Sequence, residues 1–195
     1  MLLRRKILLL GWFTLLFFPI PGYLTRYMID GVSLIDFFEV KNLEILPIGL
    51  GLEFGFIYGF IAYSIMQAPF FDTIPMKIDK IIGSMNLKFH HGIFLSLCAG
   101  LGEEFLFRSG IQPYLGWLLT SIFFVALHGY LNPWNWKFSI YGLIILPFIF
   151  LISLGFNFFG IWFCIAAHFS YDAVLFTIMI KQNSLENKID NFSNR

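Results

Sequence analysis

Two adjacent carboxylates and an arginine interrupt an apolar stretch, Leu-Gly-Glu-Glu-Phe-Leu-Phe-Arg, at residues 101–108. On an α-helix Glu104 and Arg108 lie about 40° apart, so we expect an ion pair between them. Glu103 points away from Arg108 and has no local partner. An ionisable group in such a stretch costs several kcal/mol in lipid unless it is paired or hydrated. Glu103 is therefore a candidate general base, the alternative being a carboxylate hydrated at a helix end.

Two histidines in other apolar stretches extend this set. His128 ends a run that contains Phe124, and taken alone it also suits an interfacial histidine. His168 and Asp172 share a helix face, which suits an aspartate that orients an imidazole, two ligands of one metal, or a structural hydrogen bond. A carboxylate base, two imidazoles and an acid on three helices together predict a catalytic site at Glu103, His128, His168 and Asp172.

The composition predicts an integral membrane protein. Of the 195 residues, 58% are hydrophobic and 13% charged, and the mean hydropathy is +0.76. The formal net charge of +1 provides no basic face, so we expect membrane lipid and not nucleic acid as a partner. Cys98 and Cys164 lack Cys-x-x-Cys spacing and are predicted to be core residues, not a disulfide or a thiolate zinc site.

Stretches of about 20 apolar residues, the length that crosses a bilayer as a helix, recur along the chain. They predict an all-α, polytopic bundle of about six spans, at 7–25, 54–71, 89–107, 109–136, 139–154 and 158–180. The last two form one long stretch that we expect to break near Gly155 and Asn157. With these boundaries Glu103 falls near the outer end of its span and His128 towards the inner end of the next.

Three motifs together resemble those of a known family. Glu-Glu-Phe-Leu-Phe-Arg (103–108), Phe-Val-Ala-Leu-His (124–128) and Phe-Gly-Ile-Trp-Phe-Cys-Ile-Ala-Ala-His-Phe-Ser-Tyr-Asp (159–172) are similar, in order and approximate spacing, to the motifs of the CPBP (Abi-type) intramembrane proteases. These are the CAAX prenyl endopeptidases and the bacteriocin-processing or immunity proteins. The resemblance covers roughly residues 89–180.

The resemblance implies hydrolysis of a peptide bond in a membrane-associated peptide or protein, either a CAAX-type prenylated C-terminus or a leader peptide. In this interpretation Glu103 and His128 activate a water molecule, and His168 and Asp172 stabilise the tetrahedral oxyanion. The supporting residues are Glu104, Arg108 and Phe124. It also implies a bacterial cell membrane as the location.

Asp172 stands where many family members carry Asn. An ionised carboxylate cannot donate a hydrogen bond to an oxyanion, so we expect Asp172 either to be protonated or to hold His168 as the donor. The family has also been described as metalloproteases, and a divalent metal such as zinc would take Glu103, His128, His168 and Asp172 as ligands. No His-Glu-x-x-His helix is present and a carboxylate–histidine pair can activate water unaided, so we favour a site without metal or cofactor.

The resemblance divides the chain into N-terminal spans with a connecting segment (1–80), a CPBP-like protease core (81–181) and a polar tail (182–195). The Lys and Arg residues between spans alternate in a way that places both termini in the cytoplasm. Segment 26–44, which contains Asp30, Asp36, Glu39 and Glu44, is then expected to lie on the outer face.

Two other classes of function stay open on the sequence alone. One is a non-catalytic bacteriocin self-immunity membrane protein, whose protection would survive loss of Glu103. The other is a small transporter in which intramembrane Glu, His and Asp residues relay ions. Cleavage that requires Glu103 separates the endopeptidase from both.

Overall fold

The computed structural model describes residues 2–69, 83, 85–131, 134 and 136–193. Helices are the regular elements of these ranges, which contain no strand, and the predicted all-α fold class is confirmed. The elements are α1 (Leu2–Phe17), α2 (Pro19–Asp30), α3 (Leu34–Phe37), η1 (Val40–Asn42), α4 (Ile45–Met66), α6 (Phe89–Glu104), the π-helix η3 (Phe105–Ile111), α7 (Gln112–Leu127) and α8 (Trp136–Ser193). The end of the predicted second span at residue 71 and most of the basic segment 72–88 lie outside the described residues.

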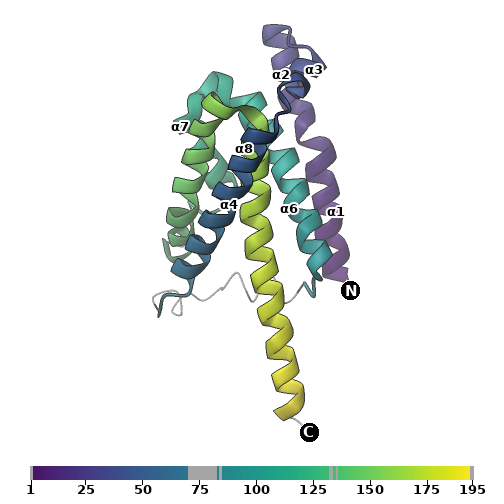
Figure 1. Cartoon of the computed structure of the whole chain (residues 1–195), viewed down its shortest axis with the longest axis vertical. Coiled ribbons are helices and arrows are strands. Elements are labelled where there is room, and N and C mark those ends of the chain that lie inside the picture. The colour runs from purple at the N-terminus through teal and green to yellow at the C-terminus, as the bar shows by residue number, and fades with distance from the viewer. Residues whose placement is uncertain (1, 70–82, 84, 132–133, 135, 194–195) are drawn as a thin grey trace.

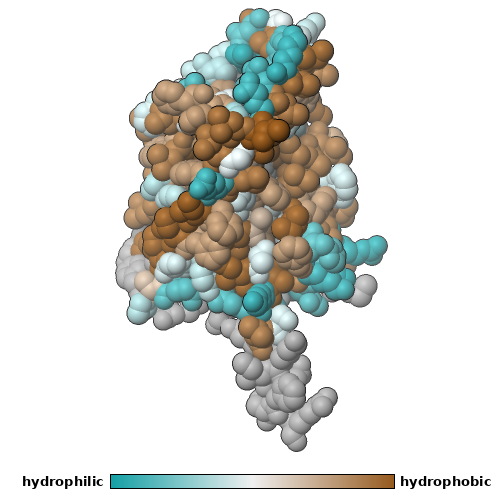
Figure 2. All heavy atoms as spheres, in the orientation of Figure 1, coloured by the Kyte–Doolittle hydropathy of each residue, from teal (hydrophilic) through white to brown (hydrophobic). Residues whose placement is uncertain are grey.

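Within the described ranges four helical segments are long and apolar enough to cross a membrane: Leu2–Asp30, Ile45–Met66, Phe89–Leu127 and Ser139–Leu185. The prediction of six spans differs because each of the last two segments contains a reversal and accounts for two predicted spans. Both chain ends lie towards the same end of the bundle (Figure 1). Hydrophobic side chains cover most of the middle of the visible face, and hydrophilic ones gather towards its two ends (Figure 2). This distribution is that of an integral membrane protein.

The first reversal occurs at Gly116, whose φ of 72° lies in the left-handed region that glycine adopts without strain. The chain after it packs back along the chain before it, since the rings of Phe107 and Phe124 are 4.8 Å apart between centroids. Glu103 precedes this turn by 13 residues and His128 follows it by 12. The hairpin therefore brings the two side chains to one level, although the predicted spans put them at different depths.

The second reversal occurs at Gly160, with φ of 74°. The predicted break near Gly155 and Asn157 is wrong, because the backbone there stays helical. At Gly160 the Glu39 carboxylate lies close enough that an added Cβ would come within 2.8 Å of its Oε2. The same Oε2 accepts the backbone N–H of Ile161 at 3.2 Å, and the Glu39 carbonyl accepts Trp162 Nε1–H at 3.0 Å. Glu39 thus caps the helical run that carries His168 and Asp172.

The segment that supplies Glu39 holds a short polar cluster. Asp36 accepts a hydrogen bond from Ser33 Oγ at 2.7 Å and lies 3.5 Å from Lys41 Nζ. The hydrogen bond and the lysine charge lower the pKa of Asp36 below its ordinary value. Asp36 lies outside the four apolar segments, in keeping with a surface position.

The part of α8 after Gly160 is also held by α4 (Figure 1). Gly55 of α4 lies so close to α8 that a Cβ there would come within 2.0 Å of the Ala167 carbonyl oxygen. Small residues of this kind allow membrane helices to pack closely, where van der Waals contact replaces the hydrophobic effect. The helical run that carries His168 is therefore held by α4 beside His168 and by Glu39 at its start.

Candidate active site

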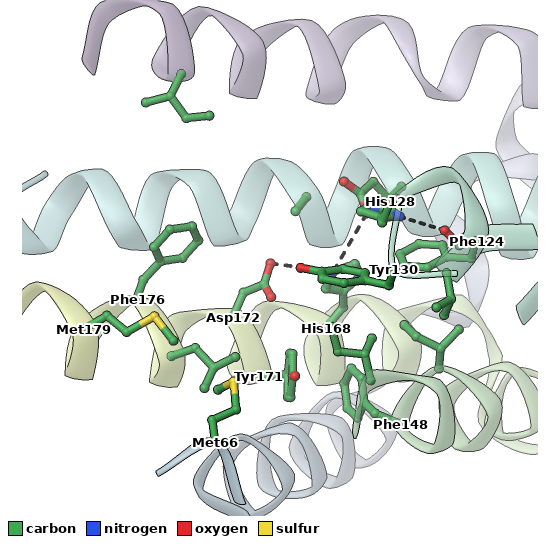
Figure 3. Close-up of a pocket in the computed structure, with 17 residues that line it drawn as sticks. Met66, Phe124, His128, Tyr130, Phe148, His168, Tyr171, Asp172, Phe176 and Met179 are labelled. Atoms are coloured by element: carbon green, nitrogen blue, oxygen red, sulfur yellow. Dashed lines mark hydrogen bonds and ion pairs between the residues drawn. The ribbon is translucent and has the colours of Figure 1, made fainter. Parts of the chain in front are cut away.

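The four residues predicted for catalysis lie around one cavity of about 450 Å³. Glu103 Oε2 lies 3.4 Å from His128 Nε2 and 4.0 Å from His168 Nε2. His168 Nε2 lies 3.6 Å from Asp172 Oδ2. Figure 3 shows His128, His168 and Asp172 arranged around this space. The structure thus places two carboxylates and two imidazoles, from three stretches of chain, within reach of a single small group.

Phe124 contacts both histidines. Its carbonyl oxygen lies 2.8 Å from His128 Nδ1, and its ring stacks on the His128 ring with centroids 4.4 Å apart. The same ring meets His168 edge-on at 5.9 Å. A carbonyl only accepts hydrogen bonds, so Nδ1 of His128 carries a proton and Nε2 is left to face Glu103. Phe124 therefore sets both the tautomer and the orientation of His128.

Glu104 forms the predicted pair with Arg108, and a further bond that the sequence did not indicate. Arg108 Nε donates to Glu104 Oε2 at 2.9 Å, and Glu104 Oε1 lies 2.7 Å from His168 Nδ1. Glu104 and Arg108 are both completely buried. A carboxylate paired with arginine is an acceptor, so His168 Nδ1 donates to it and Nε2 faces the cavity. Glu104, and not Asp172, holds Nδ1 of His168.

Arg108 has two other neighbours. Its Nη1 lies 3.4 Å from Ser153 Oγ, and its guanidinium lies over the Phe124 ring at 5.6 Å from the centroid. Ser153 in turn donates to the Gln112 side-chain oxygen at 2.6 Å. This buried network joins the element after Glu103 to the first part of α8 and supports the helix positions from which the cavity is built.

The contact between Glu103 and His128 is looser and more exposed than the contacts of this buried network. Their 3.4 Å separation is longer than a good hydrogen bond, and 14% and 35% of the respective side chains are exposed. Burial lowers the pKa of His128, which lies just beyond α7, but the nearby Glu103 carboxylate and the Phe124 carbonyl outweigh it and leave the pKa above its ordinary value. When His128 is neutral, its Nε2 and Glu103 Oε2 are both acceptors, and a water molecule between them could donate to both.

Tyr130 is a further polar residue of the cavity that sequence reasoning missed. Figure 3 shows its side chain pointing towards Asp172. Burial, with the nearby Asp172 and Glu103 carboxylates, raises the pKa of Tyr130 to about 12. Its place two residues after His128 is the one signal in the sequence. A tyrosine in an apolar stretch is otherwise an ordinary core or interfacial residue, so its type alone does not indicate a site.

Apart from Tyr171, the rest of the cavity lining is apolar. It includes side chains of α4, α7 and α8, with Met66, Val125, Phe148, Ile149, Leu175 and Met179 among them. A polar cluster at one part of a largely hydrophobic cavity is typical of sites that bind an apolar ligand and orient it through a few polar contacts.

Among the described residues, no three His, Cys, Asp or Glu side chains meet at distances that suit a metal ion. The donor types are nonetheless those of a mixed nitrogen and oxygen site, since both Nε2 atoms face Glu103 and both Nδ1 atoms are held from behind. If a divalent ion were bound, Glu103, His128, His168 and Asp172 would hold it, and it would supply Lewis-acid chemistry.

Comparison with known proteins places this geometry in context. Residues 86–174 match the family described as type II CAAX prenyl endopeptidase Rce1-like. The chain is 36% identical over 86 residues to the uncharacterised protein YpbD of Bacillus subtilis (strain 168), an alignment that covers 43% of each chain. No solved structure gives a significant match.

The matched region contains Glu103, Phe124, His128, His168 and Asp172, which the fold brings to a single cavity. It lies within apolar helices long enough to cross a bilayer. Through residues 86–174, this integral membrane protein is similar to the Rce1-like family of type II CAAX prenyl endopeptidases.

Proposed function

We propose that this chain is an intramembrane endopeptidase that hydrolyses a peptide bond by means of a water molecule activated by Glu103 and His128. The observation that carries the proposal is the pair of atoms Glu103 Oε2 and His128 Nε2, 3.4 Å apart in a largely apolar cavity. Two acceptors orient the two hydrogens of one water, whose lone pairs then face the substrate carbonyl.

The reaction follows from these positions. The water oxygen bonds to the carbonyl carbon, Glu103 takes a proton, and the π electrons move onto the carbonyl oxygen. When the tetrahedral intermediate collapses, the C–N bond breaks and the proton passes from Glu103 to the leaving amine. His168, held at Nδ1 by Glu104, presents Nε2 to this intermediate and donates to it when Nε2 is protonated.

The apolar lining supports a substrate with a large hydrophobic group, such as a prenylated CAAX-type C-terminus or the apolar part of a leader peptide. Such a substrate reaches the cavity from the lipid, which makes membrane lipid and a membrane-associated peptide or protein the partners of this chain. The family supports the prenylated substrate of the two.

We propose that the reaction needs no metal ion. Glu103 and His128 form a carboxylate–imidazole pair that can take a proton from water without a Lewis acid.

The test is cleavage by the detergent-purified full chain of a panel of peptides, some farnesylated with a CAAX-type C-terminus and some with a hydrophobic leader. We expect Glu103→Gln to lower the rate by about 10²–10⁴-fold, the usual contribution of general base catalysis. Glu53→Gln, on the exposed face of α4, makes the same chemical change and should cleave like wild type. Retained cleavage in Glu103→Gln would contradict the proposal, and loss of wild-type cleavage with a chelator would contradict its metal-free form.

We further propose that the protein lies in a bacterial cell membrane with both termini cytoplasmic. The common end of the two termini and the Bacillus relative support this orientation and location. Cysteine labelling from each side of intact cells tests it, with single cysteines introduced near each terminus and in segment 31–44. Labelling of the termini from outside would contradict the proposed orientation.

A further inference from the structure

Hydrolysis in this cavity requires a hydrogen-bond donor for the oxyanion of the tetrahedral intermediate. The four predicted residues supply few hydrogen-bond donors that face the cavity. Glu103 and an ionised Asp172 only accept, and the Nδ1–H groups of His128 and His168 are directed to the Phe124 carbonyl and to Glu104. His168 Nε2 donates only when it is protonated, and His128 Nε2 accepts while that imidazole is neutral. A donor from another residue would add a second hydrogen bond to the oxyanion.

Tyr130 has the position and the chemistry of such a donor. It lines the same cavity, and its side chain points towards Asp172 (Figure 3). Its ring lies nearly parallel to that of His128, at 7° with centroids 6.4 Å apart, and its backbone N–H donates to the Val125 carbonyl at 3.3 Å. A phenolic O–H is a hydrogen-bond donor that keeps its proton at neutral pH.

We propose that Tyr130 is a catalytic residue that donates its phenolic hydrogen bond to the oxyanion. This role rests on the proposed hydrolytic function. In the free protein the hydroxyl faces the Asp172 carboxylate. When the carbonyl π electrons move onto oxygen, the new anion competes for the same O–H. The phenol keeps its proton throughout, so the water proton still passes by way of Glu103 to the leaving amine.

The kinetic test compares Tyr130→Phe with the double variant Tyr130→Phe/Asp172→Asn, on a farnesylated peptide that ends in Cys-Val-Ile-Met. Removal of one oxyanion donor should lower kcat about 10²–10³-fold, with KM little changed. Asparagine at 172 supplies an amide donor of the same shape, so the double variant should recover much of the lost kcat. Tyr114→Phe is the control. Tyr114 does not line the cavity and donates a hydrogen bond of 2.7 Å to Asp30, so its loss should leave kcat unchanged.

Binding supplies a second readout that does not depend on turnover. A phosphinate analogue of the peptide carries a tetrahedral P–O⁻ group in place of the scissile carbonyl. We expect Tyr130→Phe to bind this analogue about 100-fold more weakly than wild type, as a lost transition-state contact requires. The cleaved product peptide should bind both proteins equally.

The outcomes separate the two proposals. An unchanged kcat in Tyr130→Phe, or equal binding of the phosphinate to both proteins, would overturn the role of Tyr130 alone. So would a loss of kcat that Asp172→Asn does not relieve, since a purely structural tyrosine would give that result. If wild type neither cleaves the peptide nor binds the phosphinate, the hydrolytic function fails and the role of Tyr130 fails with it.

Discussion

Glu103 and Glu104 are neighbours in the sequence but lie in opposite surroundings. Glu104 is fully buried and makes bonds of 2.9 Å to Arg108 and 2.7 Å to His168. Glu103 is partly exposed at the cavity, and its contacts to His128 and His168 are 3.4 and 4.0 Å. Short, mutually satisfied bonds hold a structure in place, whereas long contacts around a cavity leave capacity for a water molecule. Burial and the distance to polar partners, more than residue type, therefore distinguish the structural Glu104 from Glu103, the residue proposed to act on water.

The largest effect on stability is expected from the buried side. Arg108→Leu leaves the Glu104 carboxylate buried without its cation, and breaking a buried pair in this way costs about 3–5 kcal/mol. Unfolding of detergent-solubilised protein by heat or SDS measures the loss. A destabilisation below about 1 kcal/mol would mean that the buried Glu104–Arg108 pair does not hold the fold in place.

A smaller loss is expected at the turn before His168. Gly160→Ala forces a Cβ into a left-handed conformation and to within 2.8 Å of Glu39 Oε2, which should cost about 1–3 kcal/mol. Gly49→Ala is a matched control, because no atom lies within 4 Å of the added Cβ. Thermal unfolding of the two variants side by side should show a lower Tm for Gly160→Ala alone.

Substitution of the partly exposed Glu103 should leave the stability of the protein nearly unchanged. Glu103→Gln keeps the shape of the side chain and removes no short bond, so its free energy of unfolding should stay within about 0.5 kcal/mol of wild type. The same unfolding assay applies as for Arg108→Leu. A loss comparable to that of Arg108→Leu would show that Glu103 supports the fold and would remove the distinction between the two glutamates.

The finest effect concerns the charge on His128. Glu103 and the Phe124 carbonyl raise its pKa, and burial lowers it. Glu103→Gln removes the carboxylate charge, so the pKa of His128 should fall. Charged His128 then gives way to the neutral form at lower pH than in wild type. Titration of the imidazole signals by NMR measures the change, and an unmoved pKa would show that the two side chains do not interact.

Much of this site could be predicted from residue types, and the part that could not depends on backbone geometry. The set Glu103, His128, His168 and Asp172 follows from scarcity, because ionisable groups in apolar helices are few. The depth of each did not follow, since Gly116 turns the chain inside one apolar stretch and a π-helix follows Glu104 where a regular α-helix was assumed. Nor did the Glu104–His168 bond or the place of the second turn, both of which depend on contacts between distant segments.

Glu39, which caps the helix after Gly160, lies outside the region that matches the family. Glu39 lies 47 residues before the matched region 86–174, yet it binds the backbone immediately preceding the stretch with His168 and Asp172. The matched region is consequently not a self-sufficient module. The positions of His168 and Asp172 depend on both halves of the chain, and transferring the matched region onto other membrane helices would require a substitute for this carboxylate.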